Sequence, residues 1–340
     1  MYCKDLNKAL LPFINGYEQV CVVGDINVQK ERPSAVGHLP ALWLSVTEQT
    51  KSLDTVTKIW DFLFANDFTR RGLLIAIGGG ILTDVAGFAA ATYKRGMDYI
   101  NIPTTLLAMV DASSGGKTGI NYHGLKNSVG VFAAPLETLI CPAWLQTLPV
   151  NQFLSGFAEM LKTGLLDASL WPQVARYDLD QMPPDSLMPL IADCVAVKQR
   201  IVEADPKESG LRKALNLGHT FGHALEEIQM LNGTMSNGTL LHGYAVLYGL
   251  VAELYLSVVK LGCPREPLQQ LIQIMLHYYG RPECKCSDRD RLNALLKRDK
   301  KNERADEINC TLIHSIGSPV INQVITPDEA NEAWDYLFSL

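Results

Sequence analysis

The segment Leu215–His223 carries two histidines four residues apart, and a glycine precedes each of them. If the segment is helical, His219 and His223 share one helix face. A glycine inside a helix costs about 1 kcal/mol relative to alanine, so two of them indicate that the backbone comes close to another element or to a ligand. Neutral imidazole is a common metal ligand. The spacing therefore favours a metal or ligand site over two ordinary core histidines.

A catalytic zinc site needs three protein ligands and one open position, so the two histidines cannot complete it alone. The segment Leu240–Gly243 offers a third imidazole, His242, just before an apolar helical stretch. The predicted helix Gln152–Leu166 carries Glu159 among apolar residues, three positions before Lys162. A surface salt bridge is the ordinary interpretation of such a pair, but the apolar neighbours indicate a buried carboxylate that needs a partner.

The apolar stretch Leu73–Ile77 runs into three glycines and then into the helix-forming segment Ile81–Ala91. A strand, a glycine turn and a helix N-terminus together make an anion site, because bare backbone N–H groups and the helix dipole point at the ligand. A tight turn without a ligand is equally compatible with the glycines alone. Asp25 favours a nucleotide, since an acid at the carboxyl end of a strand can bind ribose hydroxyls.

A second glycine-rich segment, Asp111–Asn121, contains an acid, a lysine and three glycines, and Lys126 and Asn127 follow it. An exposed loop is one interpretation of this composition. Glycine-rich loops with cations also suit phosphate, so the segment is a candidate phosphate site.

The bulk composition limits the class of protein. The chain has 340 residues, of which 47% are hydrophobic and 19% charged, with a formal net charge of −6. It can bury large cores and is expected to form two domains. The acidic balance argues against non-specific binding of nucleic acid. Because neither a signal peptide nor an apolar run of about 18 residues is evident, and the cysteines lack metal-finger spacing, we expect a cytoplasmic protein without a membrane segment.

The order of elements predicts an α/β fold. Short apolar runs alternate with helical segments as far as about residue 145, which indicates a parallel sheet. The predicted strands are Gln19–Asp25, Ala41–Val46, Leu73–Ile77 and Tyr99–Pro103. After Pro149 the pattern is mostly helical. We therefore expect an N-terminal Rossmann-like, parallel-sheet nucleotide-binding domain at residues 1–148 and an all-α metal-binding domain at residues 149–340.

Six segments, in this order, closely resemble the 3-dehydroquinate synthase family. They are Gly78–Asp84, Ile102–Leu107, Asp111–Asn121, Gly156–Lys162, Leu215–His223 and Leu241–Gly243. The resemblance implies an enzyme that binds NAD and Zn²⁺ or Co²⁺, with its active site between the two domains. The implied reaction converts 3-deoxy-D-arabino-heptulosonate 7-phosphate to 3-dehydroquinate and phosphate in the shikimate pathway. Transient oxidation by NAD, phosphate elimination, re-reduction and aldol cyclisation are its implied steps.

The same resemblance implies roles for individual residues. The metal would be held by Glu159, His219 and His242. The NAD contacts would be Asp25, Asn27, Glu48, Lys51, Gly79, Gly80, Asp84, Thr104, Thr105, Lys126 and Thr147. Catalytic contacts with the substrate would come from Asp111, Lys117, Asn127, Lys162 and His223. Further substrate contacts would be Lys198, Arg212, Asn216 and one of Lys300 and Lys301. Arg95 would reach the phosphate site of the neighbouring subunit in a homodimer.

The resemblance and the spacing disagree at His223. Spacing alone would put both His219 and His223 on the metal, whereas the family uses the first and turns the second toward the phosphate. We follow the family, because Glu159 and His242 already complete three ligands. The family usually has Glu where this chain has Tyr244, from which we expect altered support around the metal and not its loss.

Arg212 and Asn216 bear on the class of substrate. Arg212 lies seven residues before His219, about two helical turns, so a continuous helix would place both on nearly the same face. Its bidentate guanidinium suits a carboxylate. This argues against the alternative of another sugar phosphate cyclase, because such enzymes act on substrates that have no carboxylate. The remaining alternatives are a metal-dependent polyol dehydrogenase of similar fold and an inactive relative that serves as a binding protein. The intact set of metal ligands and lysines argues against the inactive relative.

Overall fold

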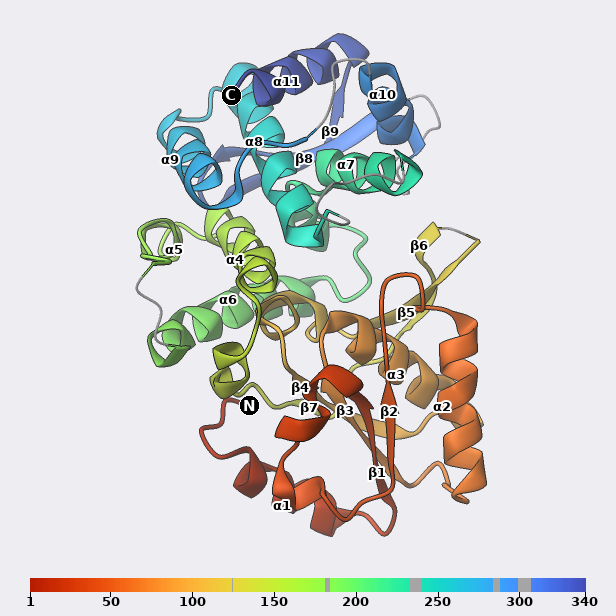
Figure 1. Ribbon diagram of the computed structural model, residues 1–340. Helices are drawn as coiled ribbons and strands as arrows, with labels where there is room; N and C mark the ends of the chain where they lie inside the picture. The colour runs from red at the N-terminus through yellow and green to blue at the C-terminus, as the bar shows by residue number, and fades with distance from the viewer. Residues whose placement is uncertain (124, 181–183, 233–239, 284–287, 299–306) are drawn as a thin grey trace. The chain divides into compact units, whose positions relative to one another are not determined.

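The computed structural model describes residues 1–123, 125–180, 184–232, 240–283, 288–298 and 307–340 (Figure 1). The chain forms two compact units. The first contains Met1–Leu148 with Pro183–Met188, and the second contains Pro149–Met182 with Pro189–Leu340. Each unit is described by itself below.

The first unit is built on a five-stranded parallel sheet with the order β2-β1-β3-β4-β7. The strands are β1 (Val20–Asp25), β2 (Ala41–Leu44), β3 (Leu73–Gly78), β4 (Asp98–Pro103) and β7 (Glu137–Thr138). All six residues of β3 are buried, as expected for a parallel sheet that is covered on both faces. The four predicted strands and the parallel sheet are therefore confirmed.

Helices α1 (Leu6–Gly16), α2 (Leu53–Ala65) and α3 (Gly80–Thr92) belong to the first unit (Figure 1). The apolar faces of α2 and α3 share one core with the sheet, because Ile59 and Val85 are fully buried beside alternate strand residues such as Ala76. Short helical turns connect these elements. They are Ile26–Glu31, Ser34–Val36, Tyr93–Arg95, Ala108–Ala112 and Pro142–Gln146.

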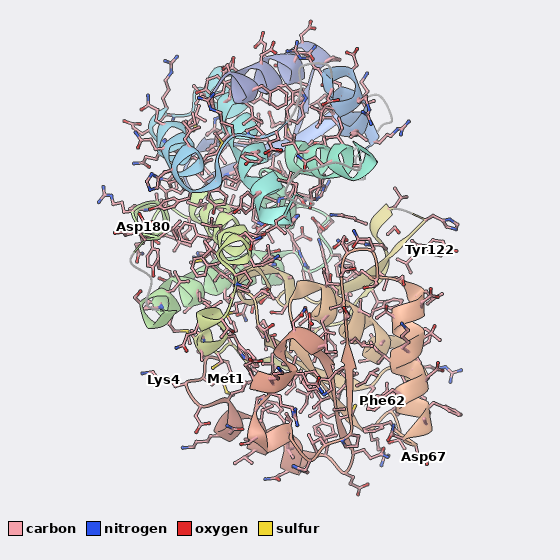
Figure 2. All side chains as sticks on the ribbon, viewed as in Figure 1. Met1, Lys4, Phe62, Asp67, Tyr122 and Asp180 are labelled. Carbon is pink, nitrogen blue, oxygen red and sulfur yellow. The ribbon has the colours of Figure 1, made fainter. Side chains whose placement is uncertain are left out.

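Two strands of the first unit, β5 (Lys117–Tyr122) and β6 (Leu125–Phe132), form an antiparallel hairpin outside the main sheet. The sequence predicts a glycine-rich segment here and no strands. The reason is that this hairpin lacks the alternation of a half-buried strand, since every residue of β6 is at least partly exposed. Tyr122, near the turn of the hairpin, is 50% exposed (Figure 2).

The second unit is mainly helical, as predicted, and includes one hairpin that the sequence analysis did not anticipate. Its helices are α4 (Val150–Leu165), α5 (Trp171–Ala175), α6 (Pro184–Ala204, of which the part up to Met188 belongs to the first unit), α7 (His219–Asn232), α8 (His242–Leu261), α9 (Glu266–Ile274), α10 (Arg289–Arg298) and α11 (Pro327–Ser339). Shorter turns lie at Leu211–Asn216 and Met275–Tyr279. Strands β8 (Ile308–Ser315) and β9 (Ser318–Ile325) pair in antiparallel fashion.

Helix α8 is the central helix of the second unit and packs against α4, α7, α11 and β8. By length and composition it could cross a membrane, but 67% of its most apolar window is buried inside the protein. A helix buried to this extent is a core helix, because its neighbours cover its apolar surface.

Glycines let the backbones of α4, α7 and α8 come unusually close. A Cβ atom on Gly249 would lie 1.9 Å from the carbonyl oxygen of Gly218, and one on Gly243 would lie 1.8 Å from that of Ser155. A Cβ on Gly222 would meet the carbonyl oxygen of Ala245 at 2.9 Å. The predicted reason for the glycines around the two histidines, close approach to another element, is therefore confirmed.

The continuous helix expected over Leu215–His223 is wrong. The turn Leu211–Asn216 is a separate 3₁₀ helix, Leu217 has an extended backbone, and α7 begins at His219. Gly218 breaks the helix because it adopts φ of +79°, a left-handed conformation that favours glycine. Arg212 and Asn216 consequently do not share a helix face with His219, and the register argument for them fails.

Candidate metal centre and nucleotide site

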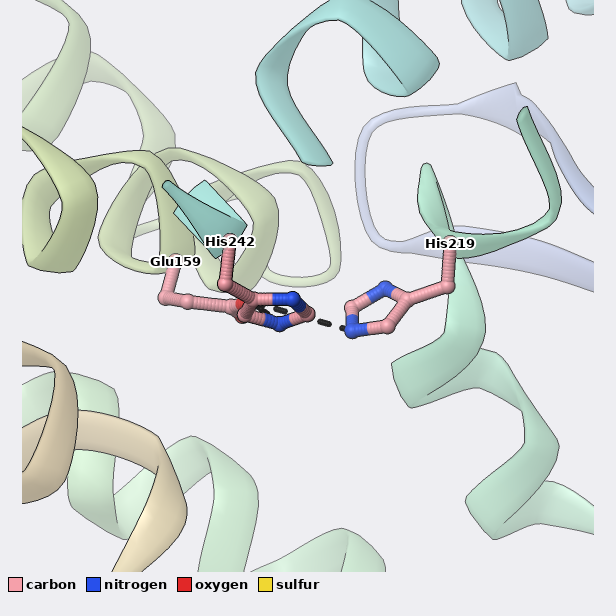
Figure 3. Close-up of side chains that lie close together, drawn as sticks. All are labelled: Glu159, His219 and His242. Carbon is pink, nitrogen blue, oxygen red and sulfur yellow. Dashed lines mark ion pairs between the residues drawn. The ribbon is translucent and has the colours of Figure 1, made fainter. Parts of the chain in front are cut away.

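Three side chains of the second unit converge from three helices (Figure 3). Glu159 lies in α4, whereas His219 and His242 are the first residues of α7 and α8. The Oε1 atom of Glu159 is 3.3 Å from Nε2 of His242 and 3.7 Å from Nε2 of His219. One ligand atom from each residue lies within 4.8 Å of the others. The close packing of α8 against α4 and α7 at their glycines brings these residues together.

The second nitrogen of each imidazole is already engaged. Nδ1 of His219 lies 3.1 Å from the carbonyl oxygen of Leu217, which can only accept, so Nδ1 carries the proton. Nδ1 of His242 lies 3.2 Å from Oε1 of Glu226 and donates to that carboxylate in the same way. The Nε2 atoms of both rings are therefore the ones directed at Glu159. Two imidazole nitrogens and one carboxylate oxygen make up a known catalytic zinc set, so the residues fit a divalent metal.

The carboxylate of Glu159 also has a cationic partner. Nζ of Lys162 lies 2.5 Å from Oε2 of Glu159, and both side chains are almost completely buried. One oxygen faces the lysine and the other faces the histidines, and a cation this close favours the ionised carboxylate. The sequence-based expectation of a buried carboxylate with a partner on the same face of α4 is confirmed.

The charge around His242 is strongly negative. Burial lowers the pKa of His242, but the carboxylates of Glu226 and Glu159 outweigh this effect and raise the pKa to about 10. A site that attracts a proton so strongly attracts a metal cation for the same reason, and the two compete for Nε2.

His223 lies beside the three ligands and is not one of them. Its ring centre is 5.4 Å from that of His219 and 6.4 Å from that of His242. Among the described residues, the group that could hold a metal consists of Glu159, His219 and His242. The metal ligands therefore stay a prediction, for which Glu159, His219 and His242 are the candidate group and His223 lies outside it.

The loop before α7 is fixed by a carboxylate. Oδ2 of Asp205 accepts hydrogen bonds from the backbone N–H groups of Gly210 and Arg212, at 2.7 and 3.1 Å, and Oδ1 accepts one from Ser209. These bonds, with that of Gly210 the largest, lower the pKa of Asp205 to about 2. Arg212 is 2% exposed and donates from Nη1 to the carbonyl oxygen of Pro206 at 2.7 Å. The buried position of Arg212 thus comes from this loop and not from helical register.

Two more predicted substrate residues lie in the second unit. Lys198, in α6, is 6% exposed. Asn216 donates from Nδ2 to Oε1 of Glu208 at 2.8 Å. Lys300 and Lys301 lie outside the described residues. Tyr244 packs its ring against that of Tyr279, with centres 4.9 Å apart, so its side chain takes part in the packing of α8.

In the first unit, predicted NAD contacts lie at the carboxyl ends of the parallel strands, where nucleotides bind in such sheets. Asp25 ends β1, Gly79 caps the N-terminus of α3 directly after β3, and Thr104 follows β4. Burial raises the pKa of Asp25, against the hydrogen bonds from Asn27 that lower it. A Cβ on Gly80 would lie 2.7 Å from Cβ of Ala112, so this turn requires a small residue. Oγ1 of Thr105 accepts a hydrogen bond from the N–H of Ala108 at 3.2 Å.

A polar network joins other predicted residues of this unit. Nζ of Lys51 lies 2.5 Å from both Oδ2 of Asp84 and Oδ1 of Asn127. Asn121 donates from Nδ2 to Oε1 of Glu48 at 2.8 Å and accepts the backbone N–H of Asn127. The network therefore ties α3 to the β5–β6 hairpin. Lys51 is 4% exposed, so its charge is compensated within the network.

The other predicted residues of the first unit occupy its turns and the hairpin. Asp111 is in the turn Ala108–Ala112, and Thr147 directly follows the turn Pro142–Gln146. Lys117 starts β5 and is exposed, and Lys126 lies in β6. Arg95 is exposed and adopts φ of +69°.

Two buried carboxylates near α7 were missed by the sequence analysis. Glu226 is 5% exposed and lies behind His242. Glu253 is fully buried and accepts the backbone N–H groups of Gly218 and Thr220, at 2.6 and 3.1 Å, so it caps the start of α7. Glu226 could have been found from its spacing, because it shares one helix face with His219 and His223 at positions i, i+4 and i+7. Nothing in the sequence near Glu253 indicates its role.

Comparisons with known proteins agree over most of the chain. Residues 41–155 match the family described as 3-dehydroquinate synthase N-terminal, and residues 156–302 match 3-dehydroquinate synthase C-terminal. A 3-dehydroquinate synthase from Parabacteroides distasonis is 42% identical over 343 residues, which covers 98% of this chain and 96% of the relative. One from Pyrococcus furiosus is 47% identical over 218 residues, which covers 63% of this chain and 62% of the relative.

A solved structure has the same fold. It is the 2-epi-5-epi-valiolone synthase from Streptomyces hygroscopicus subsp. jinggangensis 5008 with NAD⁺ and Zn²⁺ bound. Its TM-score is 0.82 at 26% identity, and the alignment covers 99% of this chain and 95% of that chain. Since both family matches adjoin each other and a relative is 42% identical along nearly the whole length, the chain belongs to the 3-dehydroquinate synthase family.

Proposed function

We propose that this chain converts 3-deoxy-D-arabino-heptulosonate 7-phosphate to 3-dehydroquinate and phosphate, as a carbon–oxygen lyase that uses NAD and Zn²⁺ or Co²⁺. The observation that carries the proposal is the convergence of Glu159, His219 and His242. Family membership supports the reaction. The relative of known structure that holds NAD⁺ and Zn²⁺ supports the cofactors.

In this proposal residues 149–340 form one domain, which contains the second unit. This domain holds the metal and the carboxylate end of the substrate. A bound metal would supply Lewis-acid polarisation of a substrate oxygen, and NAD would supply a transient hydride acceptor. Lys162 favours the ionised form of Glu159, while Leu217 and Glu226 engage the two Nδ1 atoms and leave both Nε2 atoms directed at the ligand side. The protein thereby offers the cation three negatively polarised atoms at fixed positions.

The substrate carboxylate would be bound by Arg212, Lys198 and Asn216. A buried guanidinium that is held by its own loop presents its donors without first losing side-chain freedom, which strengthens a paired contact. Lys117, Asn127 and His223 would contact the phosphate, with Asp111 and Lys162 as further catalytic groups. Lys300 or Lys301 remains a proposed substrate contact.

The first unit would form the NAD-binding domain, residues 1–148. The glycine turn at Gly79 and Gly80 exposes the N-terminus of α3, where pyrophosphate binds well. The acids Asp25 and Glu48 would bind hydroxyl groups of the nucleotide. The remaining NAD contacts that we propose are Asn27, Lys51, Asp84, Thr104, Thr105, Lys126 and Thr147.

We further propose that the protein is a cytoplasmic homodimer in which Arg95 reaches the partner's phosphate site. The hairpin β5–β6 supports a protein partner, because Leu125 and Phe132 are 62% and 58% exposed. Sedimentation of the Leu125→Glu/Phe132→Glu variant should show a monomer, because charges would be buried in the interface. A wild-type dimer that this double variant leaves intact would contradict the proposed interface.

The metal assignment is tested by His242→Ala, with His314→Ala as the matched control, since His314 is an exposed histidine of the same unit. The first variant should lose bound zinc and phosphate release together, because two ligands rarely hold a catalytic zinc ion. The control should keep both. Full zinc content in purified His242→Ala, measured by elemental analysis, would exclude this ligand set.

A further inference from the structure

Glu226 contacts the ring nitrogen of His242 that faces away from the candidate metal position. It lies seven residues after His219 on α7, two turns along the same face. The helix that carries the candidate ligand His219 therefore also carries a carboxylate that contacts the candidate ligand His242. The carboxylate of Glu226 is 5% exposed and its Oε1 lies 3.2 Å from Nδ1 of His242. The neighbouring Glu227 is exposed to solvent.

We propose that Glu226 is a positioning residue that selects the metal-binding tautomer of His242. His242 has two ring nitrogens, each facing a carboxylate: Nε2 faces Glu159 at 3.3 Å and Nδ1 faces Glu226 at 3.2 Å. The ring binds a metal only in its neutral form, and that form has one N–H to give. If it is given to Glu159, Nε2 cannot bind a metal.

The charge of Glu226 decides between these two tautomers. With the proton on Nδ1, the ring donates to Glu226 and directs its Nε2 lone pair toward Glu159 and the metal. With the proton on Nε2, the Nδ1 lone pair would face the ionised carboxylate of Glu226, which is repulsive. Glu226 therefore disfavours the tautomer that cannot bind metal, and its hydrogen bond fixes the plane of the ring.

Packing explains how Glu226 reaches His242. His242 begins α8, where α8 crosses α7, and a Cβ on Gly222 would lie 2.9 Å from the carbonyl oxygen of Ala245. This backbone contact holds one turn of α7 directly against the first turn of α8. Glu226 follows one turn after Gly222, so its side chain spans the remaining distance to the ring. The residue that orients His242 is thus carried by the same helix as His219.

The experiment compares Glu226→Ala and Glu226→Gln with Glu227→Ala, which removes the same charge from the exposed side of the helix. Metal-free protein is titrated with Zn²⁺ against a chromophoric chelator, and its thermal midpoint is recorded in parallel. Glu226→Ala should weaken zinc binding by about 10- to 100-fold. Glu226→Gln should recover only part of the affinity, because its amide oxygen can still accept from Nδ1 but it lacks the charge and its amide N–H can donate to Nδ1 instead. Glu227→Ala should bind zinc like the wild type.

Two results would overturn the inference. One is wild-type zinc affinity in Glu226→Ala. The other is an equal loss of affinity in the Ala and Gln variants accompanied by an equal fall in the thermal midpoint of the metal-free protein, which would show a purely structural role. The inference rests on the proposed metal centre, but the two fail separately. Retained zinc in His242→Ala removes the centre, whereas unchanged affinity in the Glu226 variants alone removes the role of Glu226.

Discussion

At the scale of single residues, the candidate metal centre is supported by groups outside the proposed ligand set. Lys162, Leu217 and Glu226 each engage an atom of one ligand, and together they leave three ligand atoms directed at one point. The ligands themselves can be recognised in the sequence from residue type and from resemblance to a family. Their supporting partners are harder to recognise, because a backbone carbonyl or a buried glutamate carries no distinctive pattern.

Arg212 gives the prediction at this scale. Arg212→Lys keeps the positive charge but loses the planar fork, so the KM for the carboxylated substrate should rise by about 10-fold or more. Zinc content should not change, because Arg212 is not among the proposed ligands. Lys213→Gln, which alters the adjacent and less buried residue, is the control and should have a normal KM. Steady-state phosphate release measures both variants, and a wild-type KM in Arg212→Lys would remove Arg212 from the substrate site.

At the scale of elements, backbone contact between helices determines how the ligands meet. Gly249 in α8 lies against Gly218 at the start of α7, where a Cβ would be 1.9 Å from the carbonyl oxygen. Gly249→Ala must push the two helices apart, which should lower the free energy of unfolding by about 1–3 kcal/mol and weaken zinc binding. The control is Gly164→Ala in α4, because a Cβ there would have its nearest neighbours at 3.4 Å.

Chemical denaturation and zinc titration would measure the effect of both glycine variants. The control should unfold at the same or a higher denaturant concentration, because alanine favours a helix over glycine by about 1 kcal/mol. Equal stability and zinc affinity in the two variants would mean that close contact of α7 and α8 does not set the geometry of the centre.

The same scale shows what the sequence can and cannot predict. The strands of the parallel sheet are predictable because burial on both faces requires a continuous apolar run, as in Leu73–Ile77. The β5–β6 hairpin is not, because its exposed strand has no apolar alternation. The break in the helix before His219 cannot be predicted from the sequence either. It depends on a left-handed Gly218 and on Glu253, a residue 35 positions away that accepts the N–H of Gly218.

At the scale of the whole molecule, the chain combines a parallel sheet of nucleotide-binding type with a helical unit that carries a candidate metal centre. Related folds share this combination, since a sugar phosphate cyclase at 26% identity superposes with a TM-score of 0.82. The fold therefore does not choose the substrate. Family membership and the buried Arg212 favour a substrate with a carboxylate.

The most direct test of the account supplies purified protein, NAD and Zn²⁺ with either 3-deoxy-D-arabino-heptulosonate 7-phosphate or sedoheptulose 7-phosphate, which lacks the carboxylate. Phosphate release and product identity are followed together with absorbance of NADH. We predict 3-dehydroquinate from the acid, a kcat/KM at least about 100-fold higher than for the sugar, and no accumulation of NADH. Preferential cyclisation of sedoheptulose 7-phosphate, or NADH that accumulates with turnover, would contradict the account.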